Sequence, residues 1–364
     1  MIPINRPWIG EEEKVEVQKV LEENSLTSAA REGGQRVRDF ESSLKAYLGC
    51  KHVIAVNSGT SALHASLWAA GIGPGDEVLL PSFTFVATAN SVMAAGARPV
   101  FVDIRKSDFT IDHEDMKKKI TRRTKAVIPV HLYGHPCEMD EILEISSKHS
   151  LAVIEDACQS LGSTYENKQT GTIGEMGCFS LYASKVLTSG EGGAIATNNN
   201  RLAESLMMIR NHGMVKGYDT RILGMNLRLP EMCAAIAKVQ MKKLGQMLDT
   251  RKRNALLMSE LLTGSRDFAI PQENEKKKFN WYLYTIAFDK SSTRNSVKDA
   301  LQNDGIGATI YYDPPVHKTP FYRGKAKLPV TERAAKCVLS LPVHPGVSEA
   351  QAARIAASLK VAAG

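Results

Sequence analysis

The chain has 364 residues, of which 43% are hydrophobic and 23% are charged, as in ordinary folded proteins. This length allows two domains, and the composition excludes long disordered or fibrous segments. The net charge of +7 comes from 46 lysine and arginine residues against 39 aspartate and glutamate residues. Because the basic residues are scattered, we expect no nucleic-acid partner.

The six cysteines form no C-x-x-C pair and no cluster with histidine at metal-ligand spacing. We therefore expect neither a disulfide framework nor a metal site. The first ten residues include prolines and Arg6, and no stretch is long and apolar enough to span a membrane. These features predict a cytoplasmic protein with no signal peptide and no membrane partner.

From residue 50 to about residue 200, short β-branched runs alternate with helical patterns, which predicts crossover units on a mostly parallel sheet. We predict strands at 52–56, 77–80, 99–102, 126–130, 151–154, 178–182 and 194–197, and helices at 60–70, 86–95, 113–120 and 139–149. Ligands of such a sheet gather beyond the carboxyl ends of its strands.

Residues 231–262 are rich in alanine, methionine, leucine and lysine, and they predict one long helix. A boundary near residue 245 would divide the chain into a large domain with an N-terminal arm, 1–245, and a small C-terminal α/β domain, 246–364. The small domain is predicted to contain strands at 281–288 and 310–312 and helices at 296–303 and 349–360.

Ser58, Gly59, Thr60 and Ser61 lie between a predicted strand end and a predicted helix start. The free N–H groups at a helix amino terminus, together with hydroxyl groups, can hold a phosphate. The alternative is a plain helix cap, which is favoured when this motif is considered alone.

Asp156 ends an apolar strand, where a carboxylate is costly to bury without a cationic partner. A protonated pyridinium nitrogen would be such a partner, and the acid would then preserve the electron sink of that ring. A helix cap or a surface acid is the alternative interpretation.

The segment S-L-Y-A-S-K at 180–185 is followed by G-E-G-G at 190–193. An amine beside a phosphate site, here Lys185, can form a Schiff base and later carry protons. The alternatives are a solvated surface lysine and an ordinary glycine-containing strand connection.

Motifs along nearly the whole chain resemble the DegT/StrS family of sugar aminotransferases, which are fold type I pyridoxal-phosphate (PLP) enzymes. The resemblance implies a large domain with a mostly parallel seven-stranded sheet flanked by helices, and a smaller C-terminal α/β domain. The matching motifs are N-S-G-T-S-A-L-H at 57–64, G-P-G-D-E-V at 73–78, P-S-F-T-F-V-A-T-A-N at 81–90, P-V-F-V-D-I at 99–104, P-V-H-L-Y-G at 129–134, V-I-E-D-A at 153–157, G-C-F-S-L-Y-A-S-K at 177–185, R-N-H-G at 210–213, G-M-N-L-R-L-P-E at 224–231, Y-Y-D-P-P-V-H at 311–317 and L-S-L-P-V-H-P at 339–345.

The resemblance also implies how the cofactor is held. Lys185 would be the Schiff-base lysine, and Asp156 would pair with the ring nitrogen. Phe85 would stack on the ring, and Gln159 would lie near the ring hydroxyl. The implied phosphate contacts are Gly59, Thr60, Ser61 and Ser180. As alternatives, Phe85 could belong to the core and Gln159 could be a loop hydrogen-bonding residue.

Further implied positions concern the substrate and a second subunit. Asn226 and Arg228 resemble residues that reach the neighbouring subunit's site, which implies a homodimer with shared active sites. Tyr312 and His317 resemble positions at the sugar-nucleotide entrance, although His317 could merely shape its proline-rich loop. Leu227 and the long segment 29–35 depart from the family pattern, so they bear on substrate identity.

The activity implied is transfer of an amino group from glutamate to a nucleotide-linked keto-deoxysugar. The start, I-P-I-N-R-P-W-I-G-E-E-E, resembles enzymes that act at the fourth sugar carbon, such as perosamine synthases. One alternative is a sugar dehydratase of the same fold, in which histidine replaces the lysine. A non-catalytic regulator is another, and it would be expected to lose Lys185 or Asp156. A P-loop nucleotide module is disfavoured because G-x-x-x-x-G-K-[ST] is absent.

Overall fold

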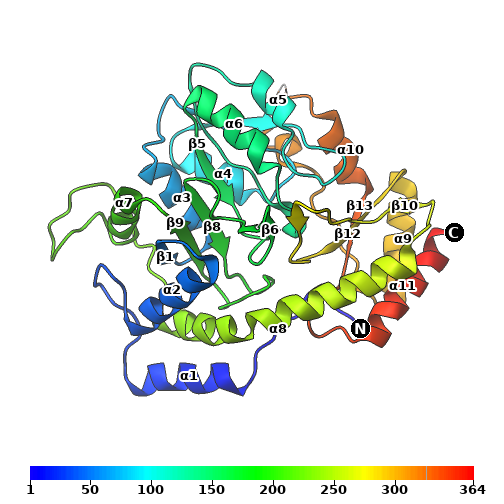
Figure 1. Cartoon of the computed structure of the whole chain (residues 1–364), viewed down its shortest axis with the longest axis horizontal. Coiled ribbons are helices and arrows are strands. Elements are labelled where there is room, and N and C mark those ends of the chain that lie inside the picture. The colour runs from blue at the N-terminus through cyan, green and yellow to red at the C-terminus, as the bar shows by residue number, and fades with distance from the viewer. Residues whose placement is uncertain (325) are drawn as a thin grey trace.

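The computed structural model describes residues 1–324 and 326–364, with a seven-stranded sheet at its centre (Figure 1). The strand order is β1-β9-β8-β5-β4-β2-β3. Strand β9 is antiparallel to β1 and β8, and the other neighbouring pairs are parallel. The predicted sheet is therefore confirmed. Its strands are β1 (His52–Val56), β2 (Glu77–Pro81), β3 (Arg98–Val102), β4 (Thr124–Val127), β5 (Ala152–Asp156), β8 (Met176–Ser180) and β9 (Gly193–Thr197).

Helices cover both faces of this sheet. Because successive side chains of a strand point to opposite faces, neighbouring residues pack against different helices. Val78 and Leu80 of β2 belong to one hydrophobic core, whereas Leu79 between them belongs to another. The first core includes residues of α2 (Gln35–Leu48), α3 (Gly59–Ala69), α4 (Ala87–Ala94) and α7 (Asn200–Arg210). The second includes residues of α5 (His113–Lys118) and α6 (Met139–His149).

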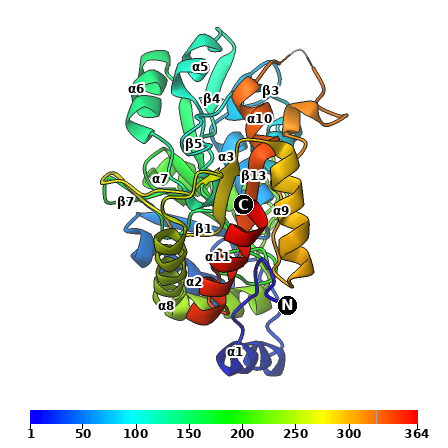
Figure 2. The same cartoon turned by 90° about the vertical axis from the view of Figure 1, so that its right-hand side faces the viewer.

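One long helix, α8 (Glu231–Leu262), connects the large sheet to the C-terminal region (Figure 1). It contacts α2 and α1 (Glu11–Glu22) near its start, and also α11 (Glu349–Ala363). Figure 2 shows α1 at the outer edge of the molecule. The expected domain boundary at residue 245 falls inside α8, and the division into two domains stays a prediction.

The C-terminal region has its own sheet and its own core. Strands β10 (Phe268–Ala269), β12 (Tyr284–Phe288) and β13 (Val338–Leu341) form an antiparallel sheet. Ile286, Val297 and Ile355 share a core beneath it, with residues from α9 (Ser291–Asn303) and α11. The remaining elements are α10 (Pro329–Cys337) and a small sheet of β6 (Thr164–Tyr165), β7 (Lys168–Gln169) and β11 (Lys277–Lys278).

The sequence predictions were wrong at one strand and incomplete elsewhere. Residues 310–312 form no strand: pairing in this segment is limited to a bridge between Thr309 and Ser340, and prolines at 314 and 315 follow. The strand predicted at 281–288 begins at Tyr284. Helices α1, α2, α7 and α10 and strands β6, β7, β10, β11 and β13 were not predicted.

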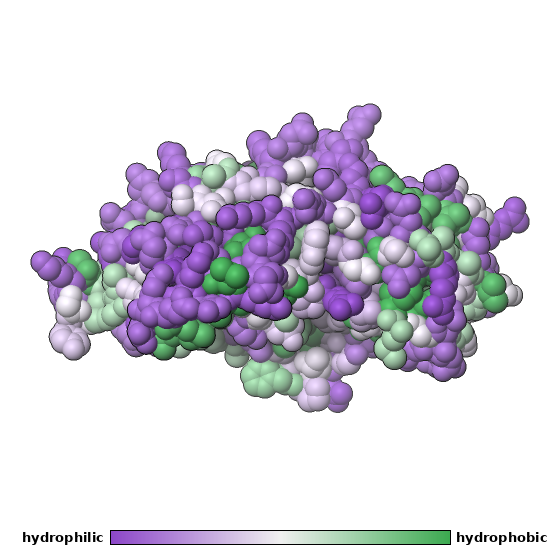
Figure 3. Space-filling view, turned by 90° about the horizontal axis from the view of Figure 1, so that it is seen from below, coloured by the Kyte–Doolittle hydropathy of each residue, from purple (hydrophilic) through white to green (hydrophobic). Residues whose placement is uncertain are grey.

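The face that carries α1 shows several separate groups of hydrophobic residues among hydrophilic ones (Figure 3). Trp8, Val15 and Leu21 are among the large hydrophobic side chains exposed in this N-terminal part. Within the part of the chain that the structure describes, no helix is both long enough and apolar enough to cross a membrane.

Candidate active site

The carboxyl ends of four parallel strands lead into the predicted site segments. Strand β1 is followed by residues 57–61, and β2 is followed by residues 82–85. Strands β5 and β8 end at Asp156 and Ser180, and Asp156 lies opposite Cys178 in their shared ladder. The fold therefore brings these segments to one edge of the sheet, as expected for an open α/β sheet.

Asp156 is a buried carboxylate with only neutral hydrogen-bond donors. It is 6% exposed. Its Oδ2 accepts a hydrogen bond from the Thr88 hydroxyl at 2.8 Å, and its Oδ1 accepts one from the Cys158 N–H at 3.2 Å. Among the described residues, no lysine, arginine or histidine forms an ion pair with it. Because an isolated buried charge is costly, this site suits a cationic ligand group.

The start of α3 is a capped helix end that could also bind an anion. The Ser58 hydroxyl accepts a hydrogen bond from the Ser61 N–H at 3.0 Å, so the predicted cap is present. The N–H groups of Gly59 and Thr60 remain available to an anion, because a helix leaves its first donors without internal partners. A β-carbon on Gly59 would lie 2.8 Å from the Ser180 β-carbon. The turn packs so closely against the end of β8 that only glycine fits at this position.

Lys185 follows β8 in a turn that its backbone closes by donating to the Tyr182 carbonyl at 2.9 Å. Its side chain is half-buried, and Nζ lies 4.8 Å from the centre of the Tyr282 ring. This arrangement is a cation–π contact. The Tyr282 hydroxyl also lies 3.2 Å from the Ser184 hydroxyl. The amine is therefore held against a neighbouring loop and is not a freely solvated charge.

Gln159 and Tyr312 are two polar candidate-site residues joined by a hydrogen bond. The Gln159 Oε1 accepts a hydrogen bond from the Tyr133 N–H at 2.9 Å, and its Nε2 donates one to the Tyr312 hydroxyl at 3.0 Å. Burial raises the pKa of Tyr312, so this hydroxyl keeps its proton and can donate it to a ligand. Phe85 is 56% exposed and its ring centre lies 6.2 Å from that of Tyr312, so it is not a core residue.

Among the described residues, no hydrogen bond joins His317, Asn226 or Arg228 to Lys185. His317 is 2% exposed, with Nδ1 2.6 Å from the Ser82 hydroxyl and Nε2 3.3 Å from a Glu332 carboxylate oxygen.

Asn226 and Arg228 make their own contacts elsewhere. Arg228 donates to the Asn211 side-chain oxygen at 2.6 Å, and the Asn226 carbonyl accepts from the Asn57 amide at 3.4 Å. Neither of these two contacts involves Lys185.

Sequence reasoning missed three residues that contact the predicted ones: Thr88, Tyr133 and Tyr282. Thr88 and Tyr133 lie inside the motifs at 81–90 and 129–134, so the same resemblance could have identified them. Tyr282 lies in no matched motif, and only the fold reveals its position beneath Lys185.

A cavity of about 700 Å³ lies elsewhere, between residues 106–109 and the C-terminal region. None of the predicted site residues lines it. The carboxyl edge of the sheet instead offers an anion site, an acid for a cationic nitrogen and a half-buried amine. This combination suits a phosphorylated ligand with a protonated aromatic nitrogen and a carbonyl carbon that an amine can attack.

Comparison with known proteins gives a match over residues 7–360 to the family described as DegT/DnrJ/EryC1/StrS aminotransferases. The GDP-perosamine synthase of Caulobacter vibrioides is 39% identical over 334 residues, covering 90% of each chain. The pleiotropic regulatory protein of Geobacillus stearothermophilus is also 39% identical, over 94% of this chain and 92% of that protein.

Solved structures agree with these relatives. S. venezuelae DesV, solved with a ketimine intermediate, has a TM-score of 0.91 and 35% identity, over 97% of this chain and 94% of that one. The PLP form of Streptococcus pneumoniae Spr1654 has a TM-score of 0.93 and 25% identity, over 100% and 98% of the two chains.

Proposed function

Because the chain belongs to the DegT/DnrJ/EryC1/StrS aminotransferase family, we propose that it transfers the amino group of glutamate to a nucleotide-linked keto-deoxysugar. It is a PLP-dependent sugar aminotransferase. A 4-keto-6-deoxyhexose is the proposed acceptor, in a route to an amino sugar for polysaccharide. The similarity to a GDP-perosamine synthase and the resemblance of the N-terminal sequence support this acceptor.

One observation carries the cofactor assignment: Asp156 is buried, accepts a hydrogen bond from Thr88 and has no basic partner among the described residues. When bound, PLP supplies an aldehyde that exchanges amino groups and a cationic ring that withdraws electrons from the reacting carbon. We assign Asp156 to the ring nitrogen, Phe85 to the face of the ring and Gln159 to its hydroxyl group.

The phosphate is assigned to the start of α3. The N–H groups of Gly59 and Thr60 belong to the first turn of α3, where the helix dipole favours a bound anion. Hydroxyl groups of Thr60, Ser61 and Ser180 border the same turn, since Gly59 packs directly on Ser180. We propose that Asn226 of the partner subunit completes this phosphate site.

Lys185 is the proposed catalytic acid and base. Its Nζ holds the cofactor between reactions, and once displaced by the donor it can take a proton from the donor carbon. The same Nζ can then deliver a proton to the sugar carbon that receives the amino group. The half-buried position over Tyr282 keeps the amine near the sheet edge during both steps.

Substrate contacts are assigned to Tyr312 and to Arg228 of the partner subunit, so a homodimer with shared sites is part of the proposal. The protonated Tyr312 hydroxyl can donate to a sugar oxygen. For His317, burial and two occupied ring nitrogens favour the alternative in which it shapes the loop.

A non-catalytic regulator is the second candidate, because one relative is named a pleiotropic regulatory protein. Lys185 and Asp156 are both present, however, and a regulator has no need to maintain a buried unpaired acid beside a held amine. The sugar dehydratase alternative is disfavoured by the lysine at position 185.

The test uses PLP-loaded protein with Lys185→Ala and with Lys51→Ala, an exposed control. We expect borohydride to fix the cofactor on a peptide containing Lys185, and glutamate to change the absorbance of wild-type and Lys51→Ala protein. A panel of nucleotide keto sugars, followed by mass spectrometry, then identifies the acceptor. Amino transfer at the normal rate by Lys185→Ala would refute the mechanism, and an inert glutamate spectrum in wild type would favour the regulator.

A further inference from the structure

We propose that Asn5 and Arg251 are positioning residues for Lys185, so that the N-terminal arm and helix α8 together hold the lysine over Tyr282. The inference rests on the proposed function only for its kinetic consequence. Its structural part concerns contacts among four segments that lie far apart in the sequence: the arm, the turn before Lys185, helix α8 and residues 281–282.

Arg251 is a buried cation without an acidic partner. It is 2% exposed, and among the described residues no carboxylate forms an ion pair with it. Burial lowers the pKa of Arg251 to about 10, so the guanidinium still carries its charge at neutral pH. Since an apolar side chain would fill this space without burying a charge, packing alone does not explain an arginine here.

The guanidinium uses its donors on two neighbouring segments. One terminal nitrogen donates to the carbonyls of Trp281 and Tyr282 at 3.3 and 3.1 Å. The other donates to the Asn5 side-chain oxygen at 3.3 Å. Arg251 therefore fixes both the backbone that carries the Tyr282 ring and the side chain of Asn5.

Asn5 links Arg251 to the turn that carries Lys185. Its Nδ2 donates to the carbonyl of Ser184, the residue directly before Lys185. The orientation of the amide is determined, because a guanidinium can only donate and a carbonyl can only accept. Exchange of the amide oxygen and nitrogen would therefore break both contacts at once.

The arm that carries Asn5 is attached independently of this residue. The Ile2 N–H donates to the Gly305 carbonyl and the Gly307 N–H donates to the Ile2 carbonyl, both at 2.7 Å. The Pro3 carbonyl also lies 3.0 Å from Nε2 of His344. Docking of the arm and positioning of Lys185 can therefore be separated by mutation.

The decisive variant is Asn5→Asp, which has the shape of asparagine but no N–H donor. It keeps an oxygen for Arg251, and the added charge strengthens that contact, whereas the hydrogen bond to Ser184 is lost. If the arm acts only as a structural attachment, Asn5→Asp should leave the amide exchange and the acetylation of Lys185 unchanged. If Asn5 positions Lys185, the arm should stay docked while the lysine turn loosens.

Two measurements on the full-length chain without PLP report this directly. Hydrogen exchange at the Gly307 amide reports arm docking, and exchange at the Lys185 amide reports the lysine turn. Acetylation of Lys185 by limiting acetic anhydride, followed by peptide mass spectrometry, reports exposure of the amine. In Asn5→Asp and Asn5→Ala we expect Lys185 exchange and acetylation to rise about threefold or more, with exposed lysines such as Lys51 unchanged.

With PLP and substrates, the same variants should lower kcat by about tenfold or more and change KM for the nucleotide sugar by less than about twofold. Arg253→Met is the matched control on α8, because Arg253 is 54% exposed at its side chain and, among the described residues, pairs only with Glu349 at the surface. Arg251→Met should resemble Asn5→Ala if it folds, but the conclusion does not depend on it.

Unchanged Lys185 exchange and acetylation in both Asn5 variants, with a folded chain, would overturn the proposal. So would equal loosening of Gly307 and Lys185 in Asn5→Asp, because the arm would then be a simple attachment. Neither result depends on which substrate the enzyme uses. Failure of the proposed function would appear separately, as wild-type protein that makes no amino sugar.

Discussion

Thr88 is the residue whose hydroxyl donates a hydrogen bond to Asp156, the proposed partner of the PLP ring nitrogen. The hydroxyl donates to Oδ2 at 2.8 Å inside a buried site, and it also lies 3.0 Å from the Thr84 hydroxyl. Hydrogen bonds to charged groups contribute about 1.5–3 kcal/mol, so Thr88→Val should weaken PLP binding by about tenfold or more. An absorbance titration of apoprotein with PLP measures the change.

Two further variants make that measurement specific. Thr88→Ser keeps the hydroxyl and should restore most of the PLP affinity, whereas Asp156→Asn removes the charge and should weaken binding at least as much as Thr88→Val. Equal affinity in wild type and Thr88→Val would show that the Thr88 hydroxyl does not support the acid.

His344 predicts a loss of stability at acidic pH. Its Nδ1 accepts from the Gly346 N–H at 3.1 Å, so the proton lies on Nε2, which donates to the Pro3 carbonyl at 3.0 Å. Burial lowers the pKa of His344 from 6.5 to about 4. Between these values the unfolded chain binds the proton and the folded chain does not, so the free energy of unfolding falls as pH falls from 6.5 towards 4.

The contribution of this one group is about 3 kcal/mol. Urea unfolding at several pH values should therefore show a shallower dependence in His344→Gln than in wild type over this range, because glutamine does not titrate. At neutral pH, His344→Gln tests only the hydrogen bonds. Parallel pH profiles for the two proteins would contradict the assignment.

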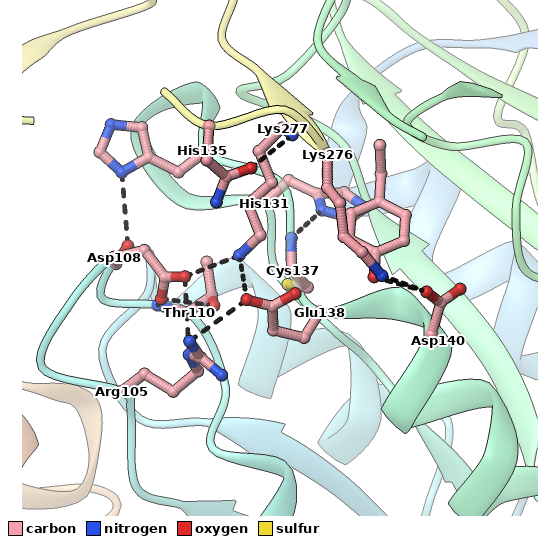
Figure 4. A network of polar contacts seen from close by, with 12 residues as sticks. Arg105, Asp108, Thr110, His131, His135, Cys137, Glu138, Asp140, Lys276 and Lys277 are labelled. Carbon is pink, nitrogen blue, oxygen red and sulfur yellow. Dashed lines mark hydrogen bonds and ion pairs between the residues drawn. The ribbon is translucent and has the colours of Figure 1, made fainter. Parts of the chain in front are cut away.

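At the scale of elements, a buried charge cluster joins β11 to two loops of the large sheet (Figure 4). Lys277 in β11 has a 4% exposed side chain, and its Nζ lies 2.7 Å from Asp108 and 3.0 Å from Glu138. Arg105 lies 3.2 Å from the same Glu138 carboxylate. Burial acts to raise the pKa of Asp108, but Lys277 and Thr110 outweigh it and the pKa is lowered.

Removing the positive charge of Lys277 should therefore lower the free energy of unfolding. Lys277→Met leaves two carboxylates with less compensation, and loss of one partner of a buried pair typically costs about 3–5 kcal/mol. The neighbouring Lys278→Met is the control, because that side chain is exposed and its change should stay within about 0.5 kcal/mol. Equal urea midpoints for the two variants would contradict the role of the cluster.

The regular alternation of strand and helix patterns made the sheet predictable. Elements with a weaker sequence pattern were missed. Strand β2 is apolar after its first residue, and β5 begins with three apolar residues, as expected for strands buried on both faces. Helix α1 is mostly exposed, so its pattern contains few core residues, and β13 is a short strand directly after α10. The wrong strand at 310–312 shows that apolar side chains alone do not supply a pairing partner.

The candidate site was predictable where chemistry follows local sequence. The acid at the end of β5, the cap before α3 and the lysine after β8 each depend on a strand end, which the sequence marks. Tyr282 and Arg251 could not be identified in this way, because their contacts join segments separated by long stretches of chain. Side-chain partners of this kind are determined by tertiary packing.

Across the whole molecule, the main hydrophobic core extends into the C-terminal region. Leu244 and Met247 of α8, together with Tyr282, Val316 and Ala335, share this core with the large sheet. The C-terminal region therefore shapes the site edge directly through Tyr282. In contrast, Asn226 and Arg228 hydrogen-bond to Asn57 and Asn211, and not to Lys185 of the same chain.

The proposed sharing of Arg228 between two subunits predicts that two inactive variants restore each other in a mixed dimer. In the proposed homodimer, Lys185→Ala and Arg228→Ala should each transfer little or no amino group. If Arg228 serves the partner subunit's site, a mixed dimer contains one site with both residues intact. Random subunit exchange makes half of the dimers mixed, so the mixture should recover about a quarter of wild-type activity.

Subunit exchange must be shown for that result to be decisive, and differently tagged variants purified through both tags provide the mixed dimer directly. The pure mixed dimer should then have about half of the wild-type activity, since one of its two sites is intact. If Arg228 instead acted on the lysine of its own chain, every site in the mixed dimer would lack one residue. An inactive mixed dimer would therefore place Arg228 in the site of its own subunit.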